Sequence, residues 1–149
     1  MLETKATSPR LQFWLCKKGK PIYLDYFPLG ISCGFPSPGD DFKENRISLD
    51  EELIKDAEAT FFARVDGNSM MNARMLDGDL LVIDKSTEPY DGCIAVCFLD
   101  GDFTIKRVQK KKDSLYLVAE NPKFQPIEIS GDSTLIVWGV VEWVIFKPK

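Results

Sequence analysis

The 149-residue sequence contains no histidine, and this absence restricts the catalytic chemistry available to the chain. A Ser-His-Asp triad needs an imidazole as its general base, so that class of hydrolase is excluded. A nucleophilic serine would have to take its base from a lysine or a carboxylate. The cysteines also lack the spacing of zinc ligands, and we expect free thiols, no metal site and no cofactor. They are Cys16, Cys33, Cys93 and Cys97.

The sequence also lacks an apolar run long enough to span a membrane, and its first residues do not resemble a secretory signal. We therefore expect a cytoplasmic protein. This expectation sets aside the leader peptidases, which are anchored in a membrane and use a serine with a lysine base.

Charge is unevenly spread along the sequence. Residues 1–33 carry five basic and two acidic side chains, a net +3, so the remainder carries −7 of the total −4. Because an acidic body repels phosphates, we expect no direct DNA binding.

Strand patterns dominate the chain from Thr60 onward. Apolar runs rich in β-branched and aromatic residues predict strands at 61–65, 80–83, 93–99, 103–108, 115–119, 127–129 and 135–146. Asp100-Gly101 predicts a two-residue hairpin between two of them. Ser48, with Glu51 three residues later, predicts a capped short helix whose Leu49, Leu53 and Ile54 face the body. We therefore expect a mainly β domain over residues 46–149.

Residues 1–45 follow a different pattern. Prolines and glycines interrupt two short apolar runs, at 11–15 and 22–29, so no long helix is expected. The pattern predicts an extended N-terminal arm without a helix-turn-helix DNA reader. The basic arm can lie along the acidic body or extend into solvent, and the sequence favours neither arrangement.

One serine and one lysine are candidates for chemistry. Ser69 lies in a glycine-containing turn between two strand-like runs, and Lys106 lies inside the run 103–108. Taken singly, such a serine is usually structural and such a lysine usually extends to solvent. Strand alternation, however, places Lys106 on a face with Thr104 and Val108. On a partly apolar face the amine loses its proton more readily and becomes a competent base.

Several motifs together resemble the LexA/UmuD family of self-cleaving Ser-Lys peptidases. They are Gly67-Asn68-Ser69-Met70, Leu76-Asp77-Gly78-Asp79-Leu80, Phe103-Thr104-Ile105-Lys106, the cleavage segment Cys33-Gly34-Phe35-Pro36-Ser37-Pro38, and Ala119-Glu120-Asn121-Pro122 with Pro126-Ile127. The separation of Ser69 from Lys106 is similar to the family's, and the resemblance covers about residues 28–146. Two features depart from it. Asn68 stands where UmuD proteins usually carry aspartate, and the arm before Cys33 is longer.

The resemblance implies a LexA/signal-peptidase-like β domain with Ser69 as nucleophile and Lys106 as general base. The bond cut would be Cys33–Gly34, and the backbone N–H groups of Ser69 and Asn68 would stabilise the oxyanion. The resemblance further implies a homodimer, stimulation by a RecA filament on single-stranded DNA, and a UmuC-like error-prone polymerase subunit as partner in the SOS response. Two alternatives stay open. One is a non-catalytic regulatory binding module on the same fold, and the other is a phage or mobile-element regulator of the family.

Overall fold

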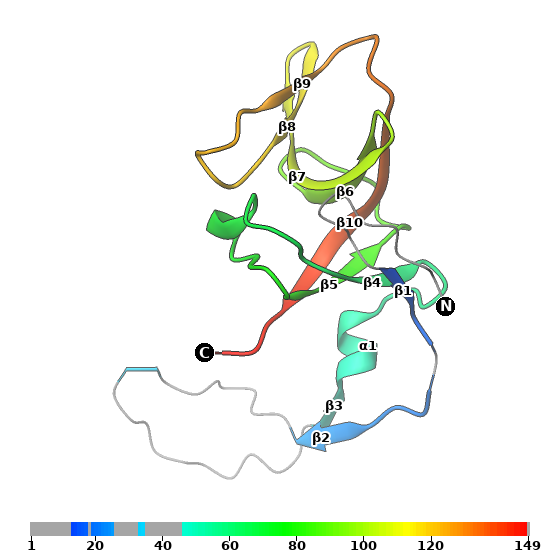
Figure 1. The fold of residues 1–149 in the computed structure, drawn as a ribbon. Helices are drawn as coiled ribbons and strands as arrows, with labels where there is room; N and C mark the ends of the chain where they lie inside the picture. The colour runs from blue at the N-terminus through cyan, green and yellow to red at the C-terminus, as the bar shows by residue number, and fades with distance from the viewer. Residues whose placement is uncertain (1–12, 18, 26–32, 35–45, 149) are drawn as a thin grey trace.

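The computed structural model describes residues 13–17, 19–25, 33–34 and 46–148, and their architecture is mainly β (Figure 1). The predicted fold class is confirmed. The strands are β1 (Phe13–Leu15), β2 (Tyr23–Asp25), β3 (Arg46–Ser48), β4 (Thr60–Arg64), β5 (Leu80–Asp84), β6 (Ile94–Leu99), β7 (Asp102–Lys111), β8 (Ser114–Val118), β9 (Ile127–Ile129) and β10 (Leu135–Ile145). The helices are α1 (Leu49–Leu53) and the 3-10 turn η1 (Met71–Ala73). In the described part of the chain, no helix has the length and apolar character that crossing a bilayer requires.

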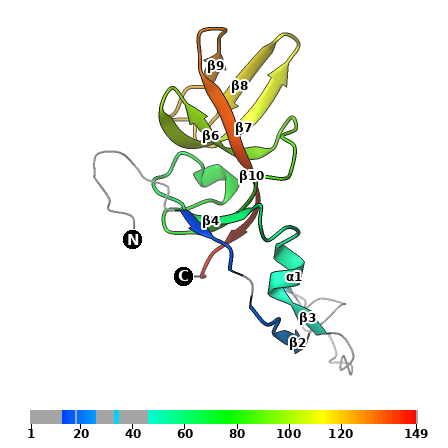
Figure 2. The same ribbon diagram turned by 90° about the vertical axis from the view of Figure 1, so that its right-hand side faces the viewer.

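The long strand β10 connects the two halves of an eight-stranded sheet. Its last residues pair with β5 and its first residues with β6, which gives the order β1-β4-β5-β10-β6-β7-β8-β9. Figure 2 shows β10 running through both halves, with β6 to β9 above and β4 below. The register shifts between Val137 and Gly139, where a Cβ would lie 2.6 Å from Ile83 Cγ2. Only glycine allows β5 and β10 to approach this closely.

The predicted hairpin at Asp100-Gly101 is present between β6 and β7. Both residues have positive φ, 48° and 94°, as a type I′ turn requires. The hairpin sets β7 antiparallel to β6, so that Ala95 lies opposite Lys106 and Cys97 opposite Thr104. The register of the candidate lysine therefore follows from a turn that the sequence specifies.

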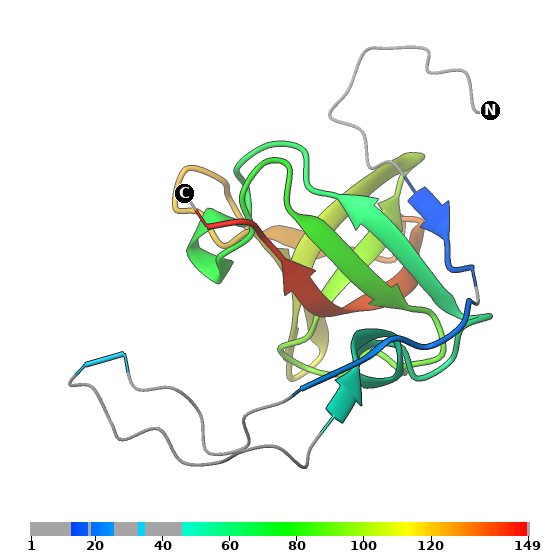
Figure 3. The ribbon, with the colours of Figure 1, turned by 90° about the horizontal axis from the view of Figure 1, so that it is seen from below.

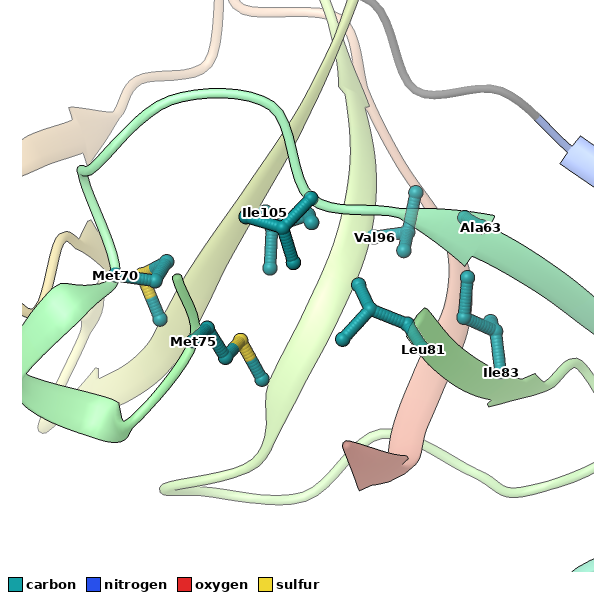
Figure 4. Close-up of a cluster of buried hydrophobic side chains, with 8 residues drawn as sticks. Ala63, Met70, Met75, Leu81, Ile83, Val96 and Ile105 are labelled. Atoms are coloured by element: carbon teal, nitrogen blue, oxygen red, sulfur yellow. The ribbon is translucent and has the colours of Figure 1, made fainter. Parts of the chain in front are cut away.

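The sheet buries side chains on both of its faces. Along β6, Val96 belongs to one core cluster with Leu81 and Ile105, while Ala95 and Cys97 belong to a second. Figure 4 shows the first cluster, in which side chains from β4, β5, β6 and β7 meet two methionines from the loop that follows β4. This packing fixes the loop that carries Ser69 against the strand that carries Lys106.

The short helix α1 is present, but its details differ from the prediction. Ser48 is the N-cap residue, yet its side chain makes no capping hydrogen bond. Ser48 is 2% exposed and also ends β3, where it pairs with Tyr23 of β2. Leu49 is 59% exposed, so the expectation that it faces the body is wrong, whereas Leu53 and Ile54 are half-buried. The helix has only five residues, too few to present a continuous apolar face.

The described parts of the arm form strands that the sequence did not predict. β1 pairs with β4 at the edge of the large sheet, with Phe13 opposite Ala63 (Figure 3). β2 pairs with β3 in a separate two-stranded ladder. Both strands lie within the two apolar runs of the arm. The domain boundary at residue 45 stays a prediction, and residues 1–12, 26–32 and 35–45 lie outside the described residues.

Candidate active site

Ser69 lies in the loop between β4 and η1, and backbone hydrogen bonds fix the base of this loop. Val65 N donates to Asp79 O at 2.9 Å, and Gly78 N donates to Val65 O at 2.8 Å. Gly67 has a φ of 97°, in the region that favours glycine, and turns the chain towards Ser69. Ser69 itself is half-buried.

The neighbour of Ser69 anchors the loop in the core. Met70 is 2% exposed and packs in the first cluster with Met75 and Ile105 (Figure 4). Burial of a side chain of this size is worth about 1.5–3 kcal/mol, which opposes any displacement of the loop. The serine hydroxyl is therefore presented by a segment whose next residue is held in the core.

Lys106 is a buried lysine with its hydrogen bonds satisfied. It is 8% exposed, and its Nζ donates to Thr104 Oγ1 at 2.7 Å and to Ile105 O at 3.1 Å. Burial lowers the pKa of Lys106 below its ordinary value, while the nearby Cys97 acts weakly in the opposite direction. Burial also raises the pKa of Cys97 to about 11, so its thiol is neutral near pH 7. A neutral amine is therefore more accessible here than on a solvated lysine.

Ser69 and Lys106 line the same cleft, which has a volume of about 300 Å³. Its walls are residues 65–70 from the serine loop, residues 103–106 from β7, and Phe124. In the described part of the chain, the Ser69 hydroxyl is not among the hydrogen-bond partners of Lys106. A larger hollow of about 500 Å³ lies between the arm and α1, but neither Ser69 nor Lys106 lines it. The smaller cleft is thus the one with the candidate chemistry.

Comparison with known proteins shows the family of this chain. A family model described as peptidase S24-like matches residues 21–142. The chain belongs to the peptidase S24 family. Protein ImpA of Salmonella typhimurium is 34% identical over 131 residues, which cover 87% of this chain and 86% of that protein. Protein MucA of the same organism is 36% identical over 122 residues, with coverage of 81% and 80%.

A LexA repressor also matches this member of the S24 family. The repressor of Aliivibrio salmonicida is 34% identical over 116 residues, which cover 77% of this chain and 56% of the repressor. The membership inferred from the motifs is therefore confirmed. It places the chain among serine peptidases at the level of the family.

The two residues of the predicted cleavage site lie outside this cleft. Cys33 and Gly34 are exposed and are not among the residues that line it. A Cβ at Gly34 would meet no atom within 4 Å. Cys93 and Cys97 are buried free thiols, whereas Cys33 is a free thiol at the surface. Among the described residues, no three histidine, cysteine or acidic side chains are grouped as metal ligands.

The backbone N–H groups at the predicted oxyanion site are available. No described residue accepts a hydrogen bond from the N–H of Asn68, Ser69 or Met70. The carbonyl of Asn68 is by contrast used, because it accepts from Met71 N at 3.2 Å and from Asn121 Nδ2 at 2.9 Å. The serine loop therefore holds three successive backbone donors that no described residue uses.

Sequence reasoning missed three contributors to this site of the S24 fold. The alternation of β7 placed Thr104 beside Lys106, but not as the acceptor of its Nζ. Asn121 belonged to a recognised motif without an assigned contact, and Phe124 was not singled out at all. The bond to Thr104 is local, between residues two apart on β7, but the other two contributions depend on tertiary contacts, and Asn121 meets Asn68 across 53 residues of sequence.

Proposed function

We propose that this protein is a self-cleaving serine peptidase that cuts its own Cys33–Gly34 bond. The observation that carries the proposal is the shared cleft, in which a half-buried serine accompanies a buried lysine of lowered pKa. Membership of the S24 family supports the reaction class. The absence of histidine leaves lysine as the base that fits the site.

The reaction proceeds in two stages. The neutral amine of Lys106 removes the hydroxyl proton of Ser69 as its oxygen attacks the carbonyl carbon of Cys33. The backbone N–H groups of Ser69 and Asn68 stabilise the negative oxygen. The C–N bond then breaks, and the ammonium of Lys106 returns the proton to the leaving amine of Gly34. Water, deprotonated by Lys106, hydrolyses the ester and frees the Cys33 carboxylate and the serine hydroxyl.

Delivery of the bond to the cleft is the step open to regulation. Cys33 and Gly34 must move from their exposed position, and glycine after the cut bond lets the backbone enter a narrow cleft. Because enzyme and substrate are one chain, the local concentration of the bond is high once it docks. A RecA filament on single-stranded DNA would favour the docked form. The shortened homodimer would then serve a UmuC-like error-prone polymerase subunit in the SOS response.

The alternative is a non-catalytic regulatory module whose arm is never cut. One observation favours it, namely the exposed position of Cys33 and Gly34 outside the cleft. Incubation of the purified protein at alkaline pH separates the two functions. Mass spectrometry should detect a fragment that begins at Gly34 if the chain cuts itself. The intact mass alone, in folded protein, would support the binding module.

Substitutions assign the roles within this experiment. We expect Ser69→Ala and Lys106→Ala each to abolish cutting, and the double variant to be no worse, since the two side chains act as one unit. Lys110→Ala is the matched control, because Lys110 is exposed on the same strand. Gly34→Glu should also block cutting through its size and charge. Wild-type rates in folded Lys106→Ala would remove the assigned base.

A further inference from the structure

The loop that follows β8 lies against the loop that carries Ser69. Its Asn121 is 4% exposed, and the side-chain amide is used at both ends. Nδ2 donates to Asn68 O at 2.9 Å, while Oδ1 accepts from Lys123 N at 3.0 Å. A buried amide with both ends paired has one orientation, because turning it over would break both bonds.

The bond to Asn68 O fixes more than a carbonyl group. In a planar trans peptide, the C=O of one residue and the N–H of the next lie in one plane and point in opposite directions. The oxygen of Asn68 accepts from Asn121 Nδ2 and from Met71 N. Two donors on the oxygen side therefore orient the N–H of Ser69 towards the opposite side. No described residue accepts from that N–H, so it remains available to a ligand.

Glu120, the residue before Asn121, connects the loop after β8 to β7, the strand that carries Lys106. The Glu120 carboxylate pairs with Arg107 Nε, and Arg107 directly follows Lys106. Arg107 is itself held by a bond from Nη1 to Gly92 O at 2.6 Å. The backbone of Glu120 reaches the serine loop, where its carbonyl accepts from Asn72 N at 2.8 Å. The loop thus connects the two walls of the cleft.

We propose that Asn121 is a positioning residue that orients the Ser69 N–H as an oxyanion donor. The inference rests on the proposed self-cleavage and adds to it a residue that touches neither the cut bond nor Lys106. Loss of the amide donor leaves the Asn68–Ser69 peptide with only the Met71 bond on its oxygen. The peptide plane then rotates more freely, and stabilisation of the transition state is weakened without a change in the base.

The test compares two substitutions with a matched control. Self-cleavage of Asn121→Ala, Asn121→Asp and wild type is followed from neutral to alkaline pH, with folding checked by circular dichroism at each point. Asn72→Ala is the control, since this exposed asparagine contributes only its backbone N–H to the loop contact. Removal of an oxyanion donor itself costs about 10²–10³ in rate, so we expect its mispositioning to cost at least about tenfold. Asn72→Ala should cut at the wild-type rate.

The relative cutting rates of the two Asn121 variants distinguish a role in orienting the peptide from a role in packing. Asn121→Asp keeps the volume of the side chain but replaces the donor with an acceptor facing Asn68 O, so this variant should be slower than Asn121→Ala. A role in packing alone gives the reverse order. Asn121→Ala adds no charge, so its plateau should fall while its pH midpoint stays at the wild-type value. If Asn121→Asp does not fold, the plateau rate and the pH midpoint of Asn121→Ala are sufficient to test the role of Asn121.

Failure of this inference differs from failure of the proposed function. A wild-type protein that never cuts itself would contradict the proposed function. A wild-type protein that cuts, together with a folded Asn121→Ala that cuts at the same rate, would overturn only the role of Asn121. A shifted midpoint in Asn121→Ala would also overturn it, because the residue would then act through Lys106.

Discussion

The cleft and the arm are held in the fold by very different means. On the cleft side, Met70 is 2% exposed, Ile105 is 7% exposed and Lys106 is 8% exposed. On the arm side, Leu15 is 74% exposed and Leu24 is 60% exposed, although both lie in strands. The difference teaches that the candidate chemical groups lie in a packed region, whereas the described strands β1 and β2, which precede the proposed cleavage site in the sequence, expose large apolar side chains.

The two strands of the arm also differ from one another. Phe13 of β1 packs on Phe103 and Trp138, with ring centroids 5.2 and 4.6 Å apart. All three residues of β2 are exposed, and its side-chain contacts are polar, such as the Tyr23 hydroxyl donating to Glu51 Oε1 at 2.7 Å. Exposed polar contacts contribute little net stability, while apolar burial contributes more. We therefore infer that β1 is the stronger anchor of the arm.

The largest expected effect is the dependence of the cutting rate on pH, which tests the cleft. We assume that the cleft is complete and that the proton on Lys106 alone limits the cutting rate. The rate of spontaneous cutting should then rise about tenfold per pH unit below the pKa of Lys106 and level off above it. Burial lowers that pKa, so the plateau should begin below the ordinary lysine value of about 10.4. Fragment yield measured by mass spectrometry gives the profile. A flat rate in folded protein would remove Lys106 as the base.

Titration of Lys106 does not itself favour unfolding as the pH rises. Because the pKa of Lys106 is lower in the folded protein, the unfolded chain binds more protons between that pKa and about 10.4. The contribution of Lys106 to stability therefore increases with pH across this window. The Cys97 thiol acts in the opposite direction, because burial raises its pKa to about 11 and its contribution to stability falls as the pH approaches that value. Urea titrations at several pH values would check that the protein remains folded.

Local patterns in the sequence predicted the sheet, but not the contacts that complete the cleft. The strand at 80–83 was recognised by its apolar run, and the hairpin at Asp100-Gly101 by its turn residues, because both signals lie within a few neighbours. The pairing of Phe13 with Ala63 joins residues fifty positions apart, and neither segment signals the other. The contact of Asn121 with Asn68 is of the same kind. Such contacts follow from the packed fold rather than from any local pattern.

An intermediate effect tests the anchor on the arm side. Phe13→Ala removes the aromatic contacts of a partly buried side chain, and we expect it to weaken the docking of β1 by about 1–2 kcal/mol. Opening of β1 should then be roughly five- to thirtyfold more frequent. Hydrogen exchange of β1 and the adjoining β4 measures this opening. Leu15→Ala, on the same strand but 74% exposed, should leave the exchange nearly unchanged. Equal effects of the two variants would mean that backbone pairing alone holds β1.

The smallest expected effect concerns β2. Tyr23→Phe removes the hydroxyl that donates to Glu51, but the side chain is exposed and both groups bind water when they are separated. We expect hydrogen exchange in β2 and β3 to change by less than about twofold. The hydrogen bond also raises the pKa of Tyr23, so Glu51→Gln should return the phenol towards its ordinary titration range without freeing the arm. An effect of Tyr23→Phe as large as that of Phe13→Ala would show that β2 anchors the arm as firmly as β1, and would erase the contrast between the two strands.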